Sequence, residues 1–260
     1  LDYLASDPNT RAILLYIESI KNRRNFMSAA RAAARNKPVL VIKAGRVSEG
    51  AKAAASHTGA LAGMDNVFDA AIARAGMLRV YDFNELFAAV EILDKSNPVK
   101  GEKLAILTNG GGPGVMGVDA LIEDGGQLVE LSEGTIDKLN KVLPKTWSHS
   151  NPIDIIGDAP GSRYADALKI LLDAKEVDAI VVMHAPTAIS SSTEVAQAVI
   201  ETIRNEKRAA QIPILTNWLG EDAVAEARDL FSKANIPTFR TPEWSVRAFM
   251  HMVRYRRNQE

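Results

Sequence analysis

The chain has 260 residues, of which 47% are hydrophobic and 24% charged, a composition typical of a folded globular protein rather than a disordered or fibrous one. A formal net charge of −1 gives no reason to expect a nucleic-acid or anionic-membrane partner. The absence of cysteine excludes disulfides, cysteine-bound zinc and thiol catalysis, and no apolar run approaches the roughly 20 residues of a membrane span. We therefore expect a cytoplasmic protein, and the length favours two α/β domains.

Short apolar runs alternate with segments of helical period before residue 97, which predicts βαβ units and a parallel sheet. We expect strands at 12–18, 38–45 and 77–81, and helices at 26–36, 64–76 and 82–96. Asp82 and Glu85 have the spacing of a helix N-cap and its capping-box partner.

Residues 96–103 combine proline, glycine and charge without an apolar period, so they predict a linker. We expect one domain at 1–98 and a second at 99–260. The second series predicts strands at 103–110, 127–131, 178–186, 212–220 and 237–240, and helices at 132–144, 163–174, 192–208, 221–234 and from 242. Both domains are predicted to be flavodoxin-like, with open, right-handed, doubly wound parallel sheets that bind ligands at the carboxyl ends of their strands.

A glycine-rich turn lies between the first strand and the first helix of the second series, at 107–121. Its residues allow backbone N–H groups to converge, and the helix N-terminus adds a partial positive charge, so the turn is a candidate phosphate site. The candidate residues are Asn109, Gly110, Gly111, Gly112 and Gly114, with Pro113 expected at the first helical position. A tight turn that needs glycine only for steric reasons explains the same pattern.

His57 lies in the stretch AAASHTGALAG, among residues too small to cover an imidazole. We expect it on a loop or in a first helical turn after a strand end, where it could act as a nucleophile or general base. Glu18 ends the first strand, and a carboxylate there could orient the imidazole. A solvated surface histidine and a solvated strand-end carboxylate are the alternatives.

Other polar residues are weaker candidates. Asn151, Asp154 and Asp158 fit a loop held by side-chain hydrogen bonds, and His184 fits a strand-end histidine with satisfied partners. His149 and His251 have no supporting context. No histidines and carboxylates share a metal-ligand spacing, so no metal site is predicted.

The chain combines a strand-end glutamate, a Ser-His-Thr-Gly stretch and an Asn-Gly-Gly-Gly-Pro-Gly helix start. In this combination it resembles the NDP-forming acyl-CoA synthetases, which are relatives of succinyl-CoA synthetase. The resemblance covers essentially the whole chain. The resemblance implies that His57 is phosphorylated and that Glu18 supports it. It also implies that the phosphoryl group is bound near Ser56, Thr58 and Gly59 and at the glycine-rich helix start. The segment NPIDI resembles a family segment to which we give a supporting role only.

The resemblance implies a reaction in three steps. Acyl-CoA and phosphate form an acyl phosphate, its phosphoryl group moves to His57, and ADP then receives that group. CoA, ATP or ADP, phosphate and magnesium are implied for a longer protein that also carries CoA-binding and ATP-grasp domains, in the same chain or another subunit. A homo-oligomer is compatible with this arrangement. Without those parts, the 260 residues are not expected to catalyse the full reaction.

The stretch from Leu215 to Glu260 also resembles the synthetase-like body of bacterial protein lysine acetyltransferases. In those proteins a Gcn5-related acetyltransferase domain is fused to the body, which is thought to sense acyl-CoA. The alternative prediction is therefore a regulatory body in which His57 is vestigial.

Overall fold

The computed structural model describes the backbone of residues 1–58 and 64–260 and the side chains of residues 1–54 and 64–260. The chain divides into two compact units. Unit 1 comprises Leu1–Asp94 and His251–Glu260, and unit 2 comprises Lys95–Met250. The domain boundary expected between residues 98 and 99 stays a prediction. In the described part of the chain, no helix has the length and apolarity that a bilayer crossing needs.

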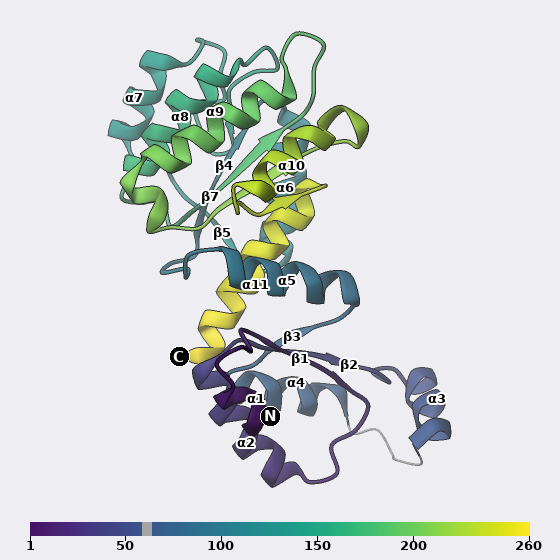
Figure 1. Ribbon diagram of the computed structural model, residues 1–260. Coiled ribbons are helices and arrows are strands. Elements are labelled where there is room, and N and C mark those ends of the chain that lie inside the picture. The colour runs from purple at the N-terminus through teal and green to yellow at the C-terminus, as the bar shows by residue number, and fades with distance from the viewer. Residues whose placement is uncertain (59–63) are drawn as a thin grey trace. The chain divides into compact units, whose positions relative to one another are not determined.

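Unit 1 contains a three-stranded parallel sheet in the order β1-β2-β3. Its strands are β1 (Ile13–Ile17), β2 (Val39–Lys43) and β3 (Leu78–Val80). Its helices are α1 (Asp2–Ser6), α2 (Arg23–Asn36), α3 (Ser48–Thr58), α4 (Asp65–Arg74) and α5 (Phe83–Lys95), the last of which ends one residue beyond the unit. In Figure 1, α1, α2 and α4 cover one face of this sheet and α5 covers the other.

The core of unit 1 follows from the alternation of side chains along its strands. Odd-numbered β1 and β2 residues pack against alanines of α2 and against Phe68 and Ile72 of α4. Leu40 and Ile42 point to the opposite face, where Leu86 and Ala89 of α5 cover them. The two faces are therefore both apolar, as expected for a parallel sheet between helical layers.

Unit 1 is completed by the end of the C-terminal helix α11 (Pro242–Gln259). The Asn258 side chain donates to the backbone oxygen of Met77 at 2.7 Å. The Gln259 side chain donates to the backbone oxygens of Ala34 at 3.1 Å and Gly76 at 2.5 Å. Residues at opposite ends of the sequence thus belong to the same unit.

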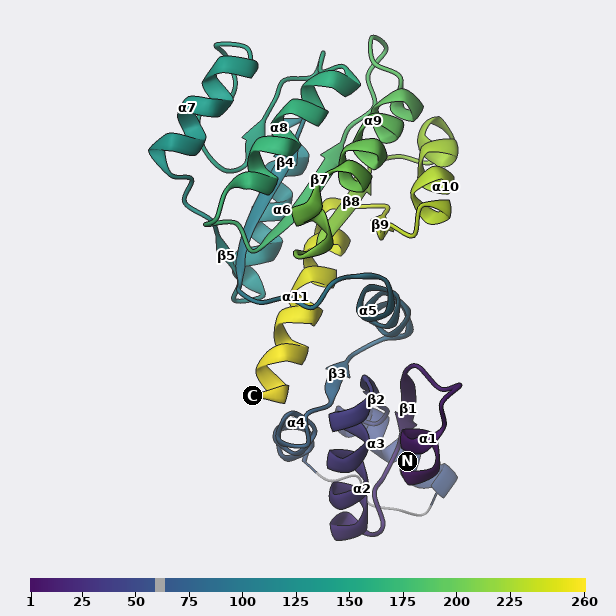
Figure 2. The same cartoon turned by 60° about the vertical axis from the view of Figure 1, so that its left-hand side comes forward.

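Unit 2 contains a larger parallel sheet in the order β5-β4-β7-β8-β9, with β6 beside β4. Its strands are β4 (Lys103–Thr108), β5 (Gln127–Leu128), β6 (Ile153–Asp154), β7 (Ala179–His184), β8 (Ile214–Trp218) and β9 (Thr238–Phe239). Its helices are α6 (Gly111–Glu123), α7 (Glu133–Val142), α8 (Gly161–Asp173), α9 (Ser192–Asn205) and α10 (Ala225–Lys233), with 3-10 turns η1 (Lys207–Ala210) and η2 (Asp222–Val224). Figure 2 shows these helices around the sheet.

The topology of unit 2 places its glycine-rich turn at a switch point. From β4 the chain moves through α6 to β5 on one side, then crosses through α8 to β7 on the other side. The connections that leave β4 and β7 therefore diverge at the carboxyl ends of these strands. Ligands of open α/β sheets bind in such crevices.

The predicted fold class, two doubly wound parallel-sheet domains of the flavodoxin-like type, is confirmed. The capping of α5 is also as predicted, because Asp82 accepts from the Glu85 N–H at 2.8 Å and the Glu85 carboxylate accepts from the Tyr81 N–H at 2.7 Å. Pro113 lies in the first turn of α6 but at its third position, because the helix begins at Gly111. The expected helix at 221–234 is interrupted, since its first turn is the 3-10 segment η2.

Candidate functional site

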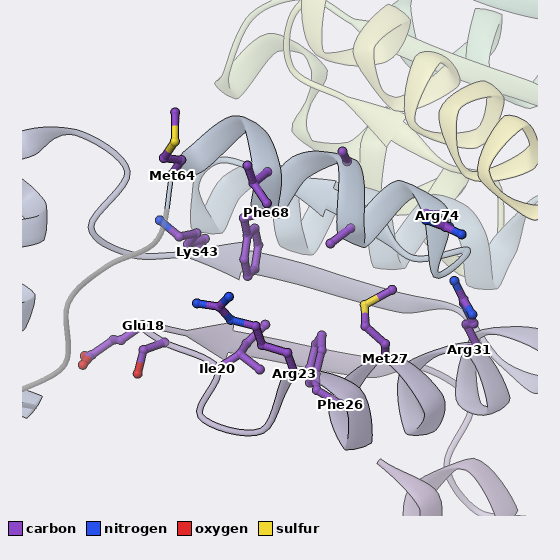
Figure 3. A pocket seen from close by; sticks show the side chains of 14 residues that line it. Glu18, Ile20, Arg23, Phe26, Met27, Arg31, Lys43, Met64, Phe68 and Arg74 are labelled. Carbon is purple, nitrogen blue, oxygen red and sulfur yellow. The ribbon is translucent and has the colours of Figure 1, made fainter.

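A pocket of about 750 Å³ opens at the carboxyl ends of β1 and β2 in unit 1. Its apolar walls come from α2 and α4 and from the turn after β1, through Ile20, Phe26, Met27, Val67 and Phe68. Its charged lining residues are Glu18, Arg23, Arg31, Lys43 and Arg74. Figure 3 shows Glu18 and Lys43 at one end of the pocket and Arg31 and Arg74 at the other. Four cations and one carboxylate thus line a pocket that lies where parallel sheets bind ligands.

Lys43 and Arg79 are buried cations, with residue exposures of 5% and 7%. Lys43 Nζ lies 3.4 Å from Asp65 Oδ1 and donates to the Gly45 backbone oxygen at 3.1 Å. Arg79 Nη2 donates to both carboxylate oxygens of Asp65 at 2.7 Å. Asp69 Oδ1 also lies 3.4 Å from Arg79 Nη1, so two carboxylates balance the two buried cations.

Asp65 is ionised because of these partners. Burial favours its neutral form, but the hydrogen bonds and positive charges of Arg79 and Lys43 outweigh burial and hold the pKa of Asp65 below its usual value. Asp65 is also the first residue of α4, where the helix dipole favours a negative charge. The Phe68 ring lies 5.6 Å from Lys43 Nζ and 5.4 Å from the Arg79 guanidinium carbon, distances at which cation–π attraction contributes.

His57 belongs to the last turn of α3 rather than to a loop or a first helical turn, so that expectation was wrong. The physical reason is the run of alanines before it, Ala53 to Ala55, which favours helix continuation up to Thr58. The side chains of Ser56, His57 and Thr58 lie outside the described residues, as does all of Gly59. Their predicted roles stay predictions.

Glu18 directly follows β1, at the strand end where the sequence predicted it, and it is half-buried. It lines the large pocket and also a shallower groove along β1. The structure therefore brings Glu18 to the same pocket as Lys43, although sequence reasoning named only Glu18.

The glycine-rich turn of unit 2 is held by two polar side chains at the end of β4. Thr108 Oγ1 accepts from the Gly110 N–H at 3.0 Å and donates to the Gly110 backbone oxygen at 2.9 Å. The Asn109 amide donates to the Ala185 backbone oxygen at 2.9 Å, and its oxygen accepts from the Ala185 N–H at 2.8 Å. Asn109 thus links the carboxyl ends of β4 and β7, which lie on either side of the switch point, through two hydrogen bonds.

The four candidate glycines have different surroundings. A Cβ on Gly114 would lie 3.1 Å from the Thr108 methyl carbon and 3.3 Å from Pro152, and one on Gly110 would lie 3.3 Å from Ala185. A Cβ on Gly112 would meet nothing within 4 Å, and one on Gly111 only the Asp154 carboxylate at 3.2 Å. Gly110 and Gly114 are therefore closely packed, whereas Gly112 faces open space.

The N-terminus of α6 carries neither a side-chain cap nor an acidic residue in its first turn. Its N-cap, Gly110, adopts extended backbone and supplies no side-chain acceptor. A thirteen-residue helix with an uncapped N-terminus at a switch point is suited to an anion.

The NPIDI segment, residues 151–155, is hydrogen-bonded to the backbone of β4, the strand that precedes this turn. The Asn151 amide donates to the backbone oxygens of Leu104 and Val129 at 2.8 and 3.2 Å, and its oxygen accepts from the Ile106 N–H at 3.0 Å. Asp154 accepts from the Ile156 N–H at 2.9 Å, and this bond accompanies a left-handed φ of 72° at Ile156. The expectation of a loop held by side-chain hydrogen bonds is confirmed.

The remaining polar candidates have structural partners. Asp158 pairs with Arg163 at 2.5 Å, a hydrogen bond that lowers the pKa of the carboxyl. His184 is fully buried between the Tyr164 hydroxyl at 3.2 Å and the Ser192 hydroxyl at 3.0 Å, and burial lowers the pKa of the imidazole to about 4. Both ring nitrogens of this strand-end histidine therefore have hydrogen-bond partners, as its sequence position predicted.

His149 contacts Asn140 Oδ1 and the Lys145 backbone oxygen, each at 3.0 Å, and His251 is buried. Among the residues whose side chains are described, no three or more histidines, aspartates or glutamates are grouped so as to hold a metal ion.

Sequence reasoning missed the buried cations, yet a signal for them was present. Lys43 ends the apolar run VLVIK, and Arg79 interrupts the run MLRVY. A charged residue inside a strand that is buried on both faces needs a partner, because isolated buried charges are costly. Their partner, Asp65, lies on a helix and could not be identified from spacing.

Comparison with known proteins agrees with this architecture. Residues 1–93 match the model of the succinyl-CoA ligase-like flavodoxin domain, and residues 104–259 match that of the ligase-CoA domain. The chain is 37% identical over 255 residues to the alpha subunit of an ADP-forming acetate–CoA ligase I from Pyrococcus furiosus, covering 98% of this chain and 54% of that subunit. It is 38% identical over 255 residues to an ADP-forming acetate–CoA ligase I from Archaeoglobus fulgidus, covering 98% of this chain and 36% of that protein.

Among solved structures, the dinucleotide-forming acetyl-coenzyme A synthetase 1 of Ca. Korarchaeum cryptofilum, in complex with phosphate and ADP, superimposes with a TM-score of 0.92 at 34% identity. The match covers 99% of this chain and 56% of that one. The chain therefore belongs to the NDP-forming acyl-CoA synthetase-like family. It spans about half the length of the alpha subunit from Pyrococcus furiosus. The alternative prediction of an acetyltransferase-associated body is not supported by these relatives.

Proposed function

We propose that the chain is the phosphohistidine-bearing part of an ADP-forming acyl-CoA synthetase. The observation that carries the proposal is Glu18, which lies at the carboxyl end of β1 and shares a cation-lined pocket with Lys43, in a chain of the synthetase family. In this proposal His57 carries a phosphoryl group between an acyl phosphate and a nucleotide.

The charges in unit 1 suit a phosphoryl carrier. A carboxylate at Glu18 accepts one imidazole N–H and so leaves the other ring nitrogen of His57 free to attack phosphorus. The transferred phosphoryl group carries about two negative charges, which Lys43 and the arginines that line the pocket stabilise. The P–O bond to the acyl oxygen breaks, the P–N bond to His57 forms, and the acid leaves as a carboxylate.

The α6 N-terminus of unit 2 is proposed as the second phosphate-binding element. Gly111 and Gly112 are exposed, so an anion can approach the first turn of α6, and the helix dipole at an exposed site contributes about 0.3–1 kcal/mol. Asn109, Gly110 and Gly114 are proposed to hold the turn in shape rather than to select the ligand.

The substrates and partners proposed here belong to a protein longer than these 260 residues. The relatives named above are ADP-forming CoA ligases and synthetases, which supports CoA, ADP and phosphate as the ligands of the whole enzyme. We propose CoA-binding and ATP-grasp domains as the partners that carry CoA and the nucleotide with its magnesium. A homo-oligomer and a cytoplasmic location stay predictions.

Phosphorylation of the full-length protein tests the proposal. Incubation with labelled ATP and magnesium is expected to give an acid-labile, alkali-stable phosphoprotein, and His57→Ala is expected to abolish the label. Glu18→Gln is expected to reduce the labelling rate, because an amide orients the imidazole less strongly than a carboxylate.

His149→Ala is the matched control, since this exposed histidine contacts Asn140 and Lys145 and has no proposed role. Its label is expected to equal that of the wild-type protein. Absence of label from the wild-type protein, or full label on His57→Ala, would contradict the proposal.

A further inference from the structure

The segment that carries His57 leaves the sheet of unit 1 and returns to it at neighbouring points. It begins after Lys43, the last residue of β2, and ends before Asp65, the first residue of α4. Lys43 Nζ lies 3.4 Å from Asp65 Oδ1, so the two ends of residues 44–64 are close together although helix α3 separates them in sequence. The position of His57 relative to Glu18 therefore depends on how firmly these two ends are held.

The first end is held at Gly45. Lys43 Nζ donates to the Gly45 backbone oxygen at 3.1 Å. Gly45 has a left-handed φ of 69°, and a Cβ there would lie 3.3 Å from Ala51 Cα and 3.4 Å from Ala54 Cβ. Helix α3 thus packs directly on Gly45, and a shift of Gly45 would shift the helix with it.

The second end is held by Arg79, which lies in β3. Arg79 Nη2 donates to both carboxylate oxygens of Asp65 at 2.7 Å, and Nη1 donates to the Asp65 backbone oxygen at 3.2 Å. Arg79 Nη1 also lies 3.4 Å from Asp69 Oδ1, one turn further along α4. A guanidinium that pairs with both oxygens of a carboxylate fixes its orientation as well as its distance. The start of α4 is therefore fixed to β3.

Arg79 also contacts the first end through an aromatic ring. The guanidinium carbon of Arg79 lies 5.0 Å from the centroid of the Tyr81 ring. The guanidinium carbon of Arg46, the residue after Gly45, lies 5.0 Å from the same centroid. Cation–π attraction acts at these distances. Arg79 thus links Asp65 at one end of the segment to Arg46 at the other.

We infer that Arg79 is a positioning residue for His57, which it aligns with Glu18 by holding both ends of residues 44–64. Among the described residues that line the pocket, Glu18 and Lys43 are present and Arg79 is not. Arg79 therefore acts on the reaction through the segment and not by contact with the phosphoryl group. A displacement of about 1 Å in reacting groups can lower a rate about a hundredfold. The inference rests on the proposed phosphorylation of His57.

The Arg79→Met variant tests the inference, because it removes the guanidinium and keeps an apolar chain in its place. The side chains of Asp65 and Asp69 are 33% and 52% exposed, so their carboxylates stay solvated, and Asp65 keeps Lys43 as a partner. In the full-length protein with labelled ATP and magnesium, Arg79→Met is expected to be labelled about tenfold to a hundredfold more slowly than the wild type. Arg79→Lys is expected to be labelled at an intermediate rate, because an ammonium group cannot pair with both carboxylate oxygens in one plane.

Ile72→Ala is the matched control for lost stability. Ile72 lies on the same helix, α4, and is fully buried in the core of unit 1, so the substitution opens a cavity there. At a temperature at which both variants remain folded, Ile72→Ala is expected to be labelled at the wild-type rate. Equal labelling rates for Arg79→Met and Ile72→Ala would overturn the inference, since Arg79 would then act through stability alone.

Hydrogen exchange separates failure of this inference from failure of the proposed function. A wild-type protein that takes no label contradicts the proposed function, and the exchange of α3 then decides whether Arg79 holds the segment. The Ala51 N–H donates to the Val47 backbone oxygen at 2.8 Å within α3. Arg79→Met is expected to speed exchange of this amide at least about tenfold more than exchange of the β2 amides. Equal acceleration of α3 and β2 would show that Arg79 does not hold the segment.

Discussion

Replacement of Asn109 by alanine tests whether this side chain joins β4 to β7. Asn109 is 3% exposed, and its amide makes two hydrogen bonds of 2.9 and 2.8 Å to the backbone of Ala185. Asn109→Ala removes both bonds and leaves the N–H and C=O of Ala185 without these partners. Each hydrogen bond contributes about 1 kcal/mol net, and Ala185 is half-buried, so water replaces part of the loss. We expect unit 2 to lose about 2 kcal/mol of unfolding free energy.

Urea unfolding followed by tryptophan fluorescence measures this loss. All three tryptophans, Trp147, Trp218 and Trp244, lie in unit 2, so the signal reports that unit alone. Asn205→Ala is the control, because Asn205 is exposed at the end of α9, and it is expected to unfold at the wild-type urea concentration. A change below about 0.5 kcal/mol in Asn109→Ala would refute the reasoning. If such a stable variant failed to be phosphorylated, Asn109 would instead contact the ligand.

Three further predictions concern the glycine-rich turn of unit 2, the buried His184 and the cluster of Lys43, Arg79 and Asp65. Gly114→Ala is expected to lower the unfolding free energy of unit 2 by about 1–3 kcal/mol, because its Cβ would lie 3.1 Å from the Thr108 methyl carbon. Gly112→Ala is expected to keep the wild-type stability and to lose phosphate affinity. Urea unfolding measures the first effect and phosphate titration the second. Burial holds the pKa of His184 at about 4, below the 6.5 of an unfolded histidine, so the unfolded chain binds the proton first as the pH falls. The unfolding free energy of unit 2 should therefore fall by roughly 3 kcal/mol between pH 6.5 and pH 4. If a His184→Gln variant lost stability as steeply over the same range, protonation of His184 would not be the cause. Asp65→Asn leaves Lys43 without its carboxylate partner and Arg79 with Asp69 alone, and it should lower the unfolding free energy of unit 1 by about 2–4 kcal/mol. Hydrogen exchange of β2 amides measures this loss, and unchanged exchange would show that water already screens these charges.

Much of the fold could be predicted because it follows from local patterns. The apolar runs at 12–18 and 38–45 become β1 and β2, and the turn chemistry of Asp82 and Glu85 sets the start of α5. The short strands β5 and β6 were harder, since each has only two residues and depends on its register with β4. Periodicity cannot define a strand of that length.

The candidate site was predictable only in part. Glu18 could be identified because a carboxylate after an apolar strand is unusual, and the glycine turn because of its composition. Helix α3 was not predicted, because glycines on both sides of His57 suggested a loop or a first helical turn there. The contact of Asp65 with Lys43 and Arg79 joins a helix to two strands, and spacing along one element cannot reveal it.

The return of the chain from unit 2 to unit 1 has a consequence for synthesis. Residues 95–250 form one continuous unit, whereas the unit that begins the chain ends with Asn258 and Gln259. On a ribosome, the backbone oxygens of Gly76 and Met77 therefore meet their partners only after the whole of unit 2 has been translated. Domains usually fold in the order in which they are made. Here unit 1, whose sequence starts before that of unit 2, completes its structure after unit 2, and removal of residues 251–260 would damage unit 1.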